Sequence, residues 1–211
     1  MSFLGFDLII RLPECLSCCV LSEWIQLKSL ARLDSAFCNR SQRSRFLNLI
    51  RGNECVCTSA VLPKYAVALD WMTLRDVKVE KLVCSGNCNG ERLTEYLLRN
   101  EKFVRSVVLC EDVKSVPSCN HLLKLTCSLS HEVCALLQAN PLLQRLEVTG
   151  GVQNAFCGEL EHISLPELSS LRVAMGKPVT MSMSSAHGLL GLVRMSTCLL
   201  ELHLYGFSFD M

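Results

Sequence analysis

An apolar pattern returns six times between about residue 79 and the end of the chain. Each copy reads apolar-x-x-Leu-x-apolar, with valine in place of the leucine in the second copy. The middle residues of the six copies are Leu82, Val107, Leu125, Leu146, Leu171 and Leu202. Their separations of 25, 18, 21, 25 and 31 residues scatter around the period of roughly 20–29 residues seen in one class of repeat protein. The pattern therefore predicts a series of short strands, one for each repeat.

Three segments between these strands have apolar residues at helical spacing. Their inward-facing residues are Leu93, Tyr96 and Leu97; Val133, Leu136 and Leu137; and Leu189, Leu192 and Val193. Serines suited to cap a helix precede the last two segments, at Ser130 and at Ser184 or Ser185. The alternation predicts an α/β solenoid with parallel strands on its concave side and helices on its convex side.

The strand residues between the apolar positions must face outward, because side chains alternate along a strand. These outward positions are Lys81, Val83, Ser85, Ser106, Val108, Cys110, Lys124, Thr126, Ser128, Arg145, Glu147, Thr149, Ser170, Arg172, Ala174, Glu201, His203 and Tyr205. The charged and aromatic members are the candidate contacts for a binding partner: Lys81, Lys124, Arg145, Glu147, Arg172, Glu201, His203 and Tyr205. The surface is mixed and mildly basic, and a merely solvated sheet face is the alternative for each residue.

The first fifty residues have helical spacing instead. One apolar series is Leu16, Val20 and Trp24, a second is Leu27, Leu30, Leu33 and Phe37, and a third is Phe46, Leu47 and Ile50. Asp34 falls outside the second series. Arg40, Arg43 and Arg45 are predicted to be solvated helix-end charges, with contact to an acidic partner as the alternative. We predict a compact unit of three helices, too small to be stable unless it packs on the following segment or on a partner.

These patterns divide the chain into three parts. Residues 1–50 form the helical unit, 51–78 a connecting or capping segment, and 79–211 the solenoid. Gly52 and Asn53 mark residues 51–59 as a loop. The chain ends seven residues after Leu204 with no visible capping element. The solenoid is therefore either truncated or covered at its end by a partner or a second copy.

The fourteen cysteines among the 211 residues bear on whether the protein resides in a reducing or an oxidising compartment. Cys84 and Cys127 hold inward strand positions and Cys134 lies in a predicted helix, where cysteine acts as a small hydrophobic residue. A chain of this length that is 50% hydrophobic does not need the disulfide framework of a short secreted domain. We expect free thiols in a reducing compartment, cytoplasmic or nuclear.

Charge and hydropathy narrow the choice of partners. The chain has 21 basic and 20 acidic side chains, which argues against nucleic acid or an anionic membrane as a partner. The most apolar stretch, residues 3–21, is interrupted by Asp7, Arg11 and Glu14 and is not a membrane helix. The start also lacks the basic region of a signal peptide.

The residues indicate neither catalysis nor a metal or cofactor site. Cys15-x-x-Cys18-Cys19 has the local spacing of a zinc knuckle, but no second pair follows at the required distance. Cys55-x-Cys57 and the pair formed by Cys84 and Cys88 also lack partners. The five histidines are scattered, and no nucleophile or phosphate-binding motif is present. We therefore expect a protein that is not an enzyme and carries no cofactor.

The stretch Leu12-Pro13-Glu14-Cys15-Leu16, followed by Val20-Leu21 and by residues 27–34, resembles an F-box in an F-box-like form. Ser29 stands where an aspartate is usual, and Cys38-Asn39-Arg40 replaces the usual Cys-x-x-Trp. The resemblance implies docking on the linker subunit of SCF-type ubiquitin ligases, from the S-phase kinase-associated protein family. It assigns that contact to Leu12, Pro13, Leu16 and Leu30. The alternative is that these four side chains fill the core of the helical unit.

Residues 79–205 resemble leucine-rich repeats of the irregular, ribonuclease-inhibitor-like kind. An F-box followed by such repeats implies a non-catalytic adaptor that docks on the linker subunit and presents the repeat face to a substrate protein of unknown identity. The alternative is a leucine-rich-repeat scaffold with a helical cap and no link to a ligase. The two hypotheses differ over residues 12–33. An adaptor leaves part of their apolar surface exposed, whereas a cap buries it against the first repeat.

Overall fold

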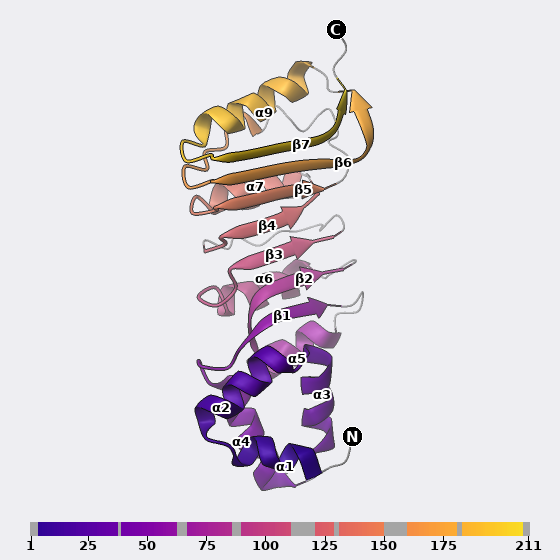
Figure 1. The fold of residues 1–211 in the computed structure, drawn as a ribbon, viewed down its shortest axis with the longest axis vertical. Coiled ribbons are helices and arrows are strands. Elements are labelled where there is room, and N and C mark those ends of the chain that lie inside the picture. Colours follow the sequence, from indigo (N-terminus) through magenta and orange to yellow (C-terminus); the bar gives the residue numbers. More distant parts are fainter. Residues whose placement is uncertain are drawn as a thin grey trace.

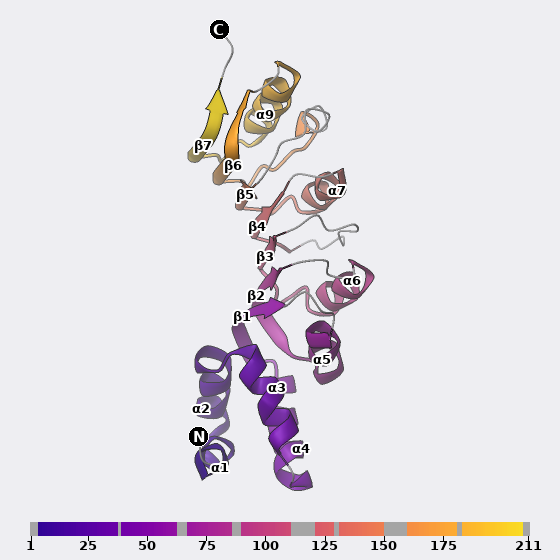
Figure 2. The ribbon, with the colours of Figure 1, turned by 90° about the vertical axis from the view of Figure 1, so that its right-hand side faces the viewer.

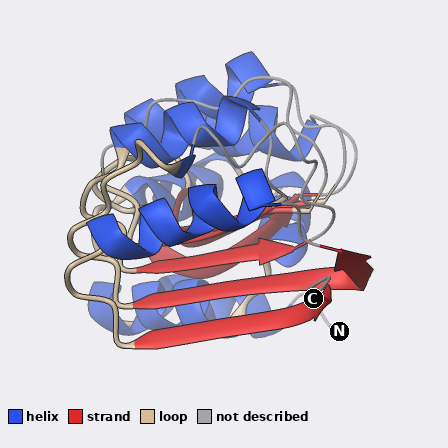
Figure 3. Cartoon of the chain, turned by 90° about the horizontal axis from the view of Figure 1, so that it is seen from above, coloured by secondary structure: helices blue, strands red, loops and turns tan. Residues whose placement is uncertain are grey.

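The computed structural model describes residues 4–37, 39–62, 67–85, 90–110, 121–128, 131–149, 160–180 and 183–208. These residues contain one seven-stranded sheet, in which every strand is parallel to its neighbour and the order β1–β7 follows the chain. The first helices lie at the β1 end of the sheet (Figure 1). The helices between strands cover one face of the sheet and leave the other face open (Figure 2, Figure 3). The predicted α/β solenoid is confirmed.

The helical unit at the β1 end is made of α1 (Leu4–Arg11), α2 (Glu14–Cys19), the π-helix η1 (Val20–Trp24), α3 (Leu27–Ala36) and α4 (Arg40–Arg51). The sequence did not predict α1, and the predicted first helix is α2 continued as η1. The polar stretch 39–44 forms the cap and the start of α4. The Asn39 side chain accepts hydrogen bonds from the backbone N–H groups of Ser41 and Gln42. It thereby caps α4, so the polar residues form the first turn of the helix.

Eleven elements of the described residues make up the solenoid. Its strands are β1 (Val56–Leu62), β2 (Lys78–Cys84), β3 (Ser106–Leu109), β4 (Lys124–Cys127), β5 (Arg145–Thr149), β6 (Ser170–Thr180) and β7 (Glu201–Ser208). Its helices are α5 (Val67–Arg75), α6 (Gly90–Arg99), α7 (His131–Ala139) and α9 (Met183–Met195). Each of the three helices predicted from sequence is present. The proposed caps Ser130, Ser184 and Ser185 lie outside the residues whose side chains are described.

The solenoid begins earlier in the chain than the sequence predicts. The sequence predicts a loop over 51–59 and a connecting or capping segment over 51–78, whereas in the structure this part contributes β1 and α5. Strand β1 pairs with β2 along its whole length, from Val56 opposite Lys78 to Leu62 opposite Cys84. The prediction failed because β1 lacks the repeated leucine and places the small residues Cys57 and Ala60 inward.

The core of the solenoid is built from the repeated motif. In the first five copies all three apolar residues are buried, among them Leu82, Leu125 and Leu146. The sixth copy differs, because Leu202 and Leu204 remain substantially exposed. They lie on β7, the outer strand of the sheet, so they have a neighbouring strand on one side only.

Buried asparagines end two of the helices and turn the chain toward the next strand. Asn100 follows α6 and donates through Nδ2 to the Tyr96 carbonyl oxygen at 3.0 Å. Asn140 follows α7 and donates in the same way to the Leu136 carbonyl oxygen at 2.7 Å. Its Oδ1 accepts from the backbone N–H of Leu122, just before β4, at 3.1 Å. Asn140 therefore satisfies polar backbone groups at both ends of the unit formed by β4 and α7.

Replacing Asn140 with alanine is expected to lower the free energy of unfolding by about 2 kcal/mol, because a buried N–H and a buried carbonyl lose their partner. Urea unfolding followed by circular dichroism measures the change. Gln138→Ala is the control, since Gln138 is exposed on the same helix. Equal losses in both variants would contradict a special role for the asparagine.

A buried carboxylate joins the helical unit to the solenoid. Asp34 of α3 is 3% exposed, although the sequence placed it outside the apolar stripe. Its Oδ1 accepts from Nε of Arg43 in α4 at 2.9 Å. Its Oδ2 accepts from Nε1 of Trp71 at 3.1 Å and from Nε of Arg75 at 2.8 Å, both in α5. Arg43 is thus a structural partner of Asp34 and not a freely solvated charge, which corrects the prediction.

A buried lysine makes a second connection between the same two parts. Lys78, the first residue of β2, donates through Nζ to the carbonyl oxygen of Arg51, the last residue of α4. The same ammonium group forms an ion pair with Asp76 at 3.1 Å. A cation at the carboxyl end of a helix interacts favourably with the helix dipole. The helical unit and the first repeat are therefore held together by charged groups as well as by apolar packing.

Candidate protein-binding surfaces

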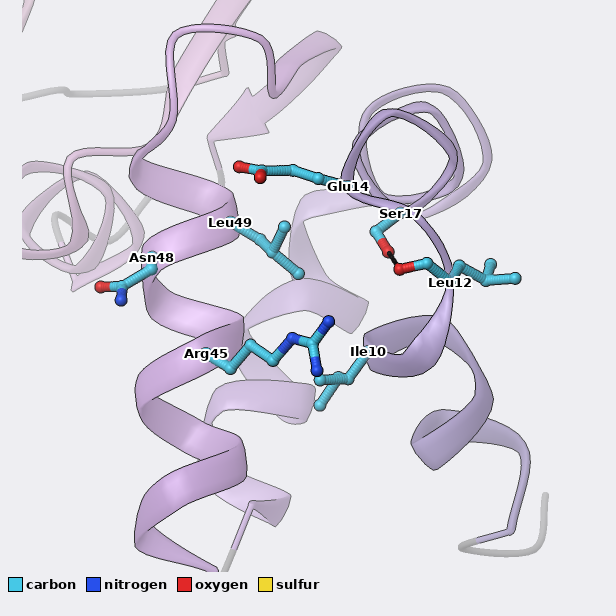
Figure 4. Close-up of a pocket in the computed structure, with 7 residues that line it drawn as sticks. All are labelled: Ile10, Leu12, Glu14, Ser17, Arg45, Asn48 and Leu49. Atoms are coloured by element: carbon cyan, nitrogen blue, oxygen red, sulfur yellow. Dashed lines mark hydrogen bonds between the residues drawn. The ribbon is translucent and has the colours of Figure 1, made fainter.

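The turn between α1 and α2 carries the Leu12-Pro13 pair. Ser17 is fully buried in α2, and its Oγ donates to the Ile9 carbonyl oxygen at 2.6 Å. The same Oγ lies 3.3 Å from the Leu12 carbonyl oxygen (Figure 4). These contacts hold the turn against α2 and leave Leu12 half-buried and Pro13 exposed. Sequence reasoning missed Ser17, since a serine within an apolar series carries no signal of its own.

A small pocket of about 130 Å³ lies beneath this turn, between the α1–α2 junction and α4. Arg45 extends from α4 toward Ile10, and Leu49 points into the same space (Figure 4). Leu12 and Glu14 line the pocket from the other side. The surface beside Leu12 is therefore hollowed and not flat.

The helix α2–η1 presents an apolar stripe to solvent. Leu16 is 52% exposed and Trp24 is 80% exposed, and Val20 lies half-buried between them. The opposite face carries the residues that pack into the unit: Ser17, Cys18, Leu21 and Ser22. The fourfold spacing thus marks the outer face of this helix. We call Leu16, Val20 and Trp24 the outer stripe.

The four residues assigned to linker contact do not share one environment. Leu12, Pro13 and Leu16 lie together at the start of α2 and reach the surface. Leu30 of α3 is completely buried, among the apolar residues of the helical unit. Its side chain is available to the core of that unit and not to a partner that docks on the outside.

The open face of the sheet aligns the outward residues in rows, because each strand pairs with the next in regular register. One row runs Ser59, Lys81, Ser106, Lys124, Arg145, Ser170 and Glu201. The neighbouring row runs Val61, Val83, Val108, Thr126, Glu147, Arg172 and His203. Seven of the eight candidate contact residues lie in these two rows, and Tyr205 lies in the next row, opposite Ala174. All eight are therefore on the same face, as the alternation predicts. Ser170 alone among the predicted outward residues is buried.

Four of these residues interact at the β5–β7 end of the open face. Arg172 lies 3.6 Å from the Glu147 carboxylate, and its guanidinium carbon is 5.3 Å from the centre of the Tyr205 ring. The rings of His203 and Tyr205 stack with centroids 6.1 Å apart. The charges of Glu147 and Arg172 are therefore already engaged with one another.

A groove of about 810 Å³ lies where the helical unit meets the sheet. Its apolar walls come from Leu27 and Ala31 of α3, Val61 of β1, and Val67 and Trp71 of α5. Val61 is 61% exposed and Val67 is 74% exposed. Sequence reasoning missed the groove because two of its three walls belong to residues 51–78, which were expected to be a connecting segment.

The described cysteines are free thiols. Burial raises the pKa of Cys57 to about 11 and that of Cys127 to about 12, so both stay protonated at neutral pH. Cys15 is exposed whereas Cys18 is buried. Over the described ranges no group of three histidine, cysteine, aspartate or glutamate side chains has metal-binding geometry, and Cys88 lies outside these ranges. No helix in the described residues is long and apolar enough to cross a bilayer.

Comparison of the chain with protein-family models, with curated proteins and with solved structures gives no match.

Proposed function

We propose that the chain is a non-catalytic substrate adaptor of an SCF-type ubiquitin ligase. The helical unit docks on the linker subunit, and the open face of the sheet binds a substrate protein. One observation carries the proposal. The outer stripe exposes a leucine and a tryptophan on the helix that follows the F-box-like Leu12-Pro13 turn. A single exposed apolar residue needs no explanation, but a contiguous stripe of large ones is typical of an interaction site.

The packing of the helical unit supports the same proposal over a simple cap. The unit contacts the first repeat through η1, α3 and α4, which pack on β1 or α5. Leu21 and Ser22 of η1 are buried, while Trp24 at the end of η1 is 80% exposed. A unit that served only as a cap would be expected to bury the outer stripe, which instead remains exposed to solvent. We therefore favour docking over capping.

The adaptor proposal predicts that Leu16→Ala combined with Trp24→Ala weakens linker binding at least about a hundredfold, because buried apolar anchors supply most of the energy of a protein interface. The measurement is a titration of the purified linker subunit against the intact chain and the double variant. Circular dichroism should show that both are folded to the same extent, since both side chains are exposed.

Leu142→Ala combined with Leu190→Ala is the matched control. Both leucines are about as exposed as Leu16 but lie on the solenoid, so this variant should bind the linker like the intact chain. Failure of the intact, folded chain to bind the linker would contradict the adaptor proposal. A leucine-rich-repeat scaffold with a helical cap would then be the better description.

A further inference from the structure

We propose that the groove and the open face together bind an extended acidic segment of a partner protein, with one large apolar side chain of that segment seated in the groove. The inference rests on the part of the proposed function that assigns protein binding to the open face. It does not depend on docking of the linker subunit.

The groove, with a volume of about 810 Å³, has ample room for one large apolar side chain of a partner. Its exposed walls are aliphatic at Val61 and Val67, and the half-buried Trp71 lines it as well. The Trp71 N–H is already bonded to Asp34, so the indole offers only its apolar surface. Burial of a leucine-sized or phenylalanine-sized side chain against such walls contributes favourably by removing apolar area from water.

The part of the row nearest the groove is basic. Lys81, Lys124 and Arg145 are all exposed, and none of them forms an ion pair with another residue of the described part of the chain. Arg172 differs, since it is engaged with Glu147 and Tyr205. Three free cations on one row favour a ligand with several carboxylates. They are too few to hold nucleic acid on a chain whose net charge is only +1.

The groove and the basic row are continuous. Ser59 lines the groove and is the register partner of Lys81. Neighbouring strands lie about 4.8 Å apart, so the strands that carry Lys81, Lys124 and Arg145 lie about 5, 14 and 19 Å from β1. An extended chain advances about 3.3 Å per residue. A segment crossing the strands would therefore meet these cations about two, four and six residues after its apolar anchor.

The probe for this inference is a library of random ten-residue peptides displayed on phage and selected against the full chain. We expect enriched peptides to carry one large apolar residue and at least two aspartates or glutamates within the next seven positions. A selected peptide, labelled with fluorescein, then serves for titration by fluorescence anisotropy. Absence of enrichment over uncoated beads, or enrichment of peptides without acidic residues, would overturn the inference.

Charge reversal tests the basic row. Lys124→Glu combined with Arg145→Glu should weaken binding of the selected peptide at least about tenfold, because two attractions become repulsions. Lys102→Glu combined with Arg194→Glu makes the same change in net charge at exposed positions off the open face, and should leave the affinity within about twofold. An equal loss in both variants would mean that only the overall charge matters, and the row would not be a binding site.

A second pair of variants tests the groove. Val67→Asp places a carboxylate in its wall and should weaken the selected peptide at least about fivefold. Leu74→Asp is the matched control on the same helix, exposed at 68% and outside the groove, and it should have no effect. A ten-nucleotide single-stranded DNA that displaces the peptide at a lower concentration than free peptide does would also overturn the inference, in favour of a nucleic-acid ligand.

Linker binding measured on the same preparations separates this inference from the adaptor proposal. Retained linker binding without peptide selection would reject the acidic-segment site alone. The opposite outcome is a chain that does not bind the linker but binds the selected peptide, with losses of affinity in the charge-reversal and groove variants as expected. That outcome would reject the adaptor proposal and retain the acidic-segment site.

Discussion

Replacing Asp34 with alanine is expected to lower the free energy of unfolding by about 3 kcal/mol. This is the lower end of the range for breaking a buried ion pair by removing one partner, because the remaining Arg43 and Arg75 are 41% and 21% exposed. The carboxylate accepts hydrogen bonds from Arg43, Trp71 and Arg75, and alanine leaves these donors without their acceptor. Urea unfolding at pH 7 measures the loss. Asp70→Ala is the control, because the Asp70–Arg92 pair lies half-exposed on the surface, where such pairs contribute no more than about 1 kcal/mol. Similar losses in both variants would contradict the role given to Asp34.

The same carboxylate should make stability depend on pH in a defined window. Burial by itself raises the pKa of Asp34, but the hydrogen bonds from Arg43, Trp71 and Arg75 outweigh it and hold the pKa below its ordinary value. The contribution of Asp34 is therefore complete above the unfolded-state pKa of about 3.9. It is lost as the pH falls through the lower folded-state pKa. The stability difference between the intact chain and Asp34→Asn should stay constant from about pH 7 to 5 and shrink below about pH 4.

Replacing Leu30 with alanine is expected to cost about 3 to 4 kcal/mol, since Leu30 is fully buried in α3 and truncation leaves a cavity in the helical unit. Thermal or urea unfolding measures the loss. Leu16→Ala is the matched control: it removes the same atoms from a side chain that is 52% exposed, and should cost well under about 1 kcal/mol.

The Leu30→Ala and Leu16→Ala variants should also differ in how they affect linker binding. Any loss of binding in Leu30→Ala should follow the fraction of unfolded chain, and should be recovered under conditions that restore folding. Any loss in Leu16→Ala should persist in the folded protein. A folded Leu30→Ala variant that still fails to bind would show that this buried position acts on the docking surface after all.

The repeated part of the fold was predictable because it obeys one simple rule. Alternation along each strand separates inward residues such as Leu125 from outward ones such as Lys124, and the observed register follows that separation. The helices were predictable for the same reason, since Leu93, Tyr96 and Leu97 share a face and are buried together. Local periodicity was therefore sufficient to predict both the architecture and the residues of the open face.

The parts that the sequence did not reveal depend on contacts between distant segments. Strand β1 fills its inward positions with Cys57 and Ala60, which do not form a leucine pattern. Asp34 has the appearance of a surface residue until α5 brings Trp71 and Arg75 to it from 37 and 41 positions away. The groove has the same origin, because its walls come from α3, β1 and α5. A pattern of apolar and polar residues within a ten-residue window carries no information about contacts between such distant segments.

The carboxylate of Asp34 affects how accurately the solenoid is oriented relative to the helical unit. It lies near one end of the sheet, and β7 is six strand spacings from β1, or about 29 Å at 4.8 Å per strand. A rotation of about 10° at the junction would carry β7 sideways by about 5 Å, which is one strand spacing. The three hydrogen bonds to Asp34 lie at the junction about which such a rotation would occur. Their stiffness determines how closely the far end of the open face keeps its position relative to anything bound by the outer stripe.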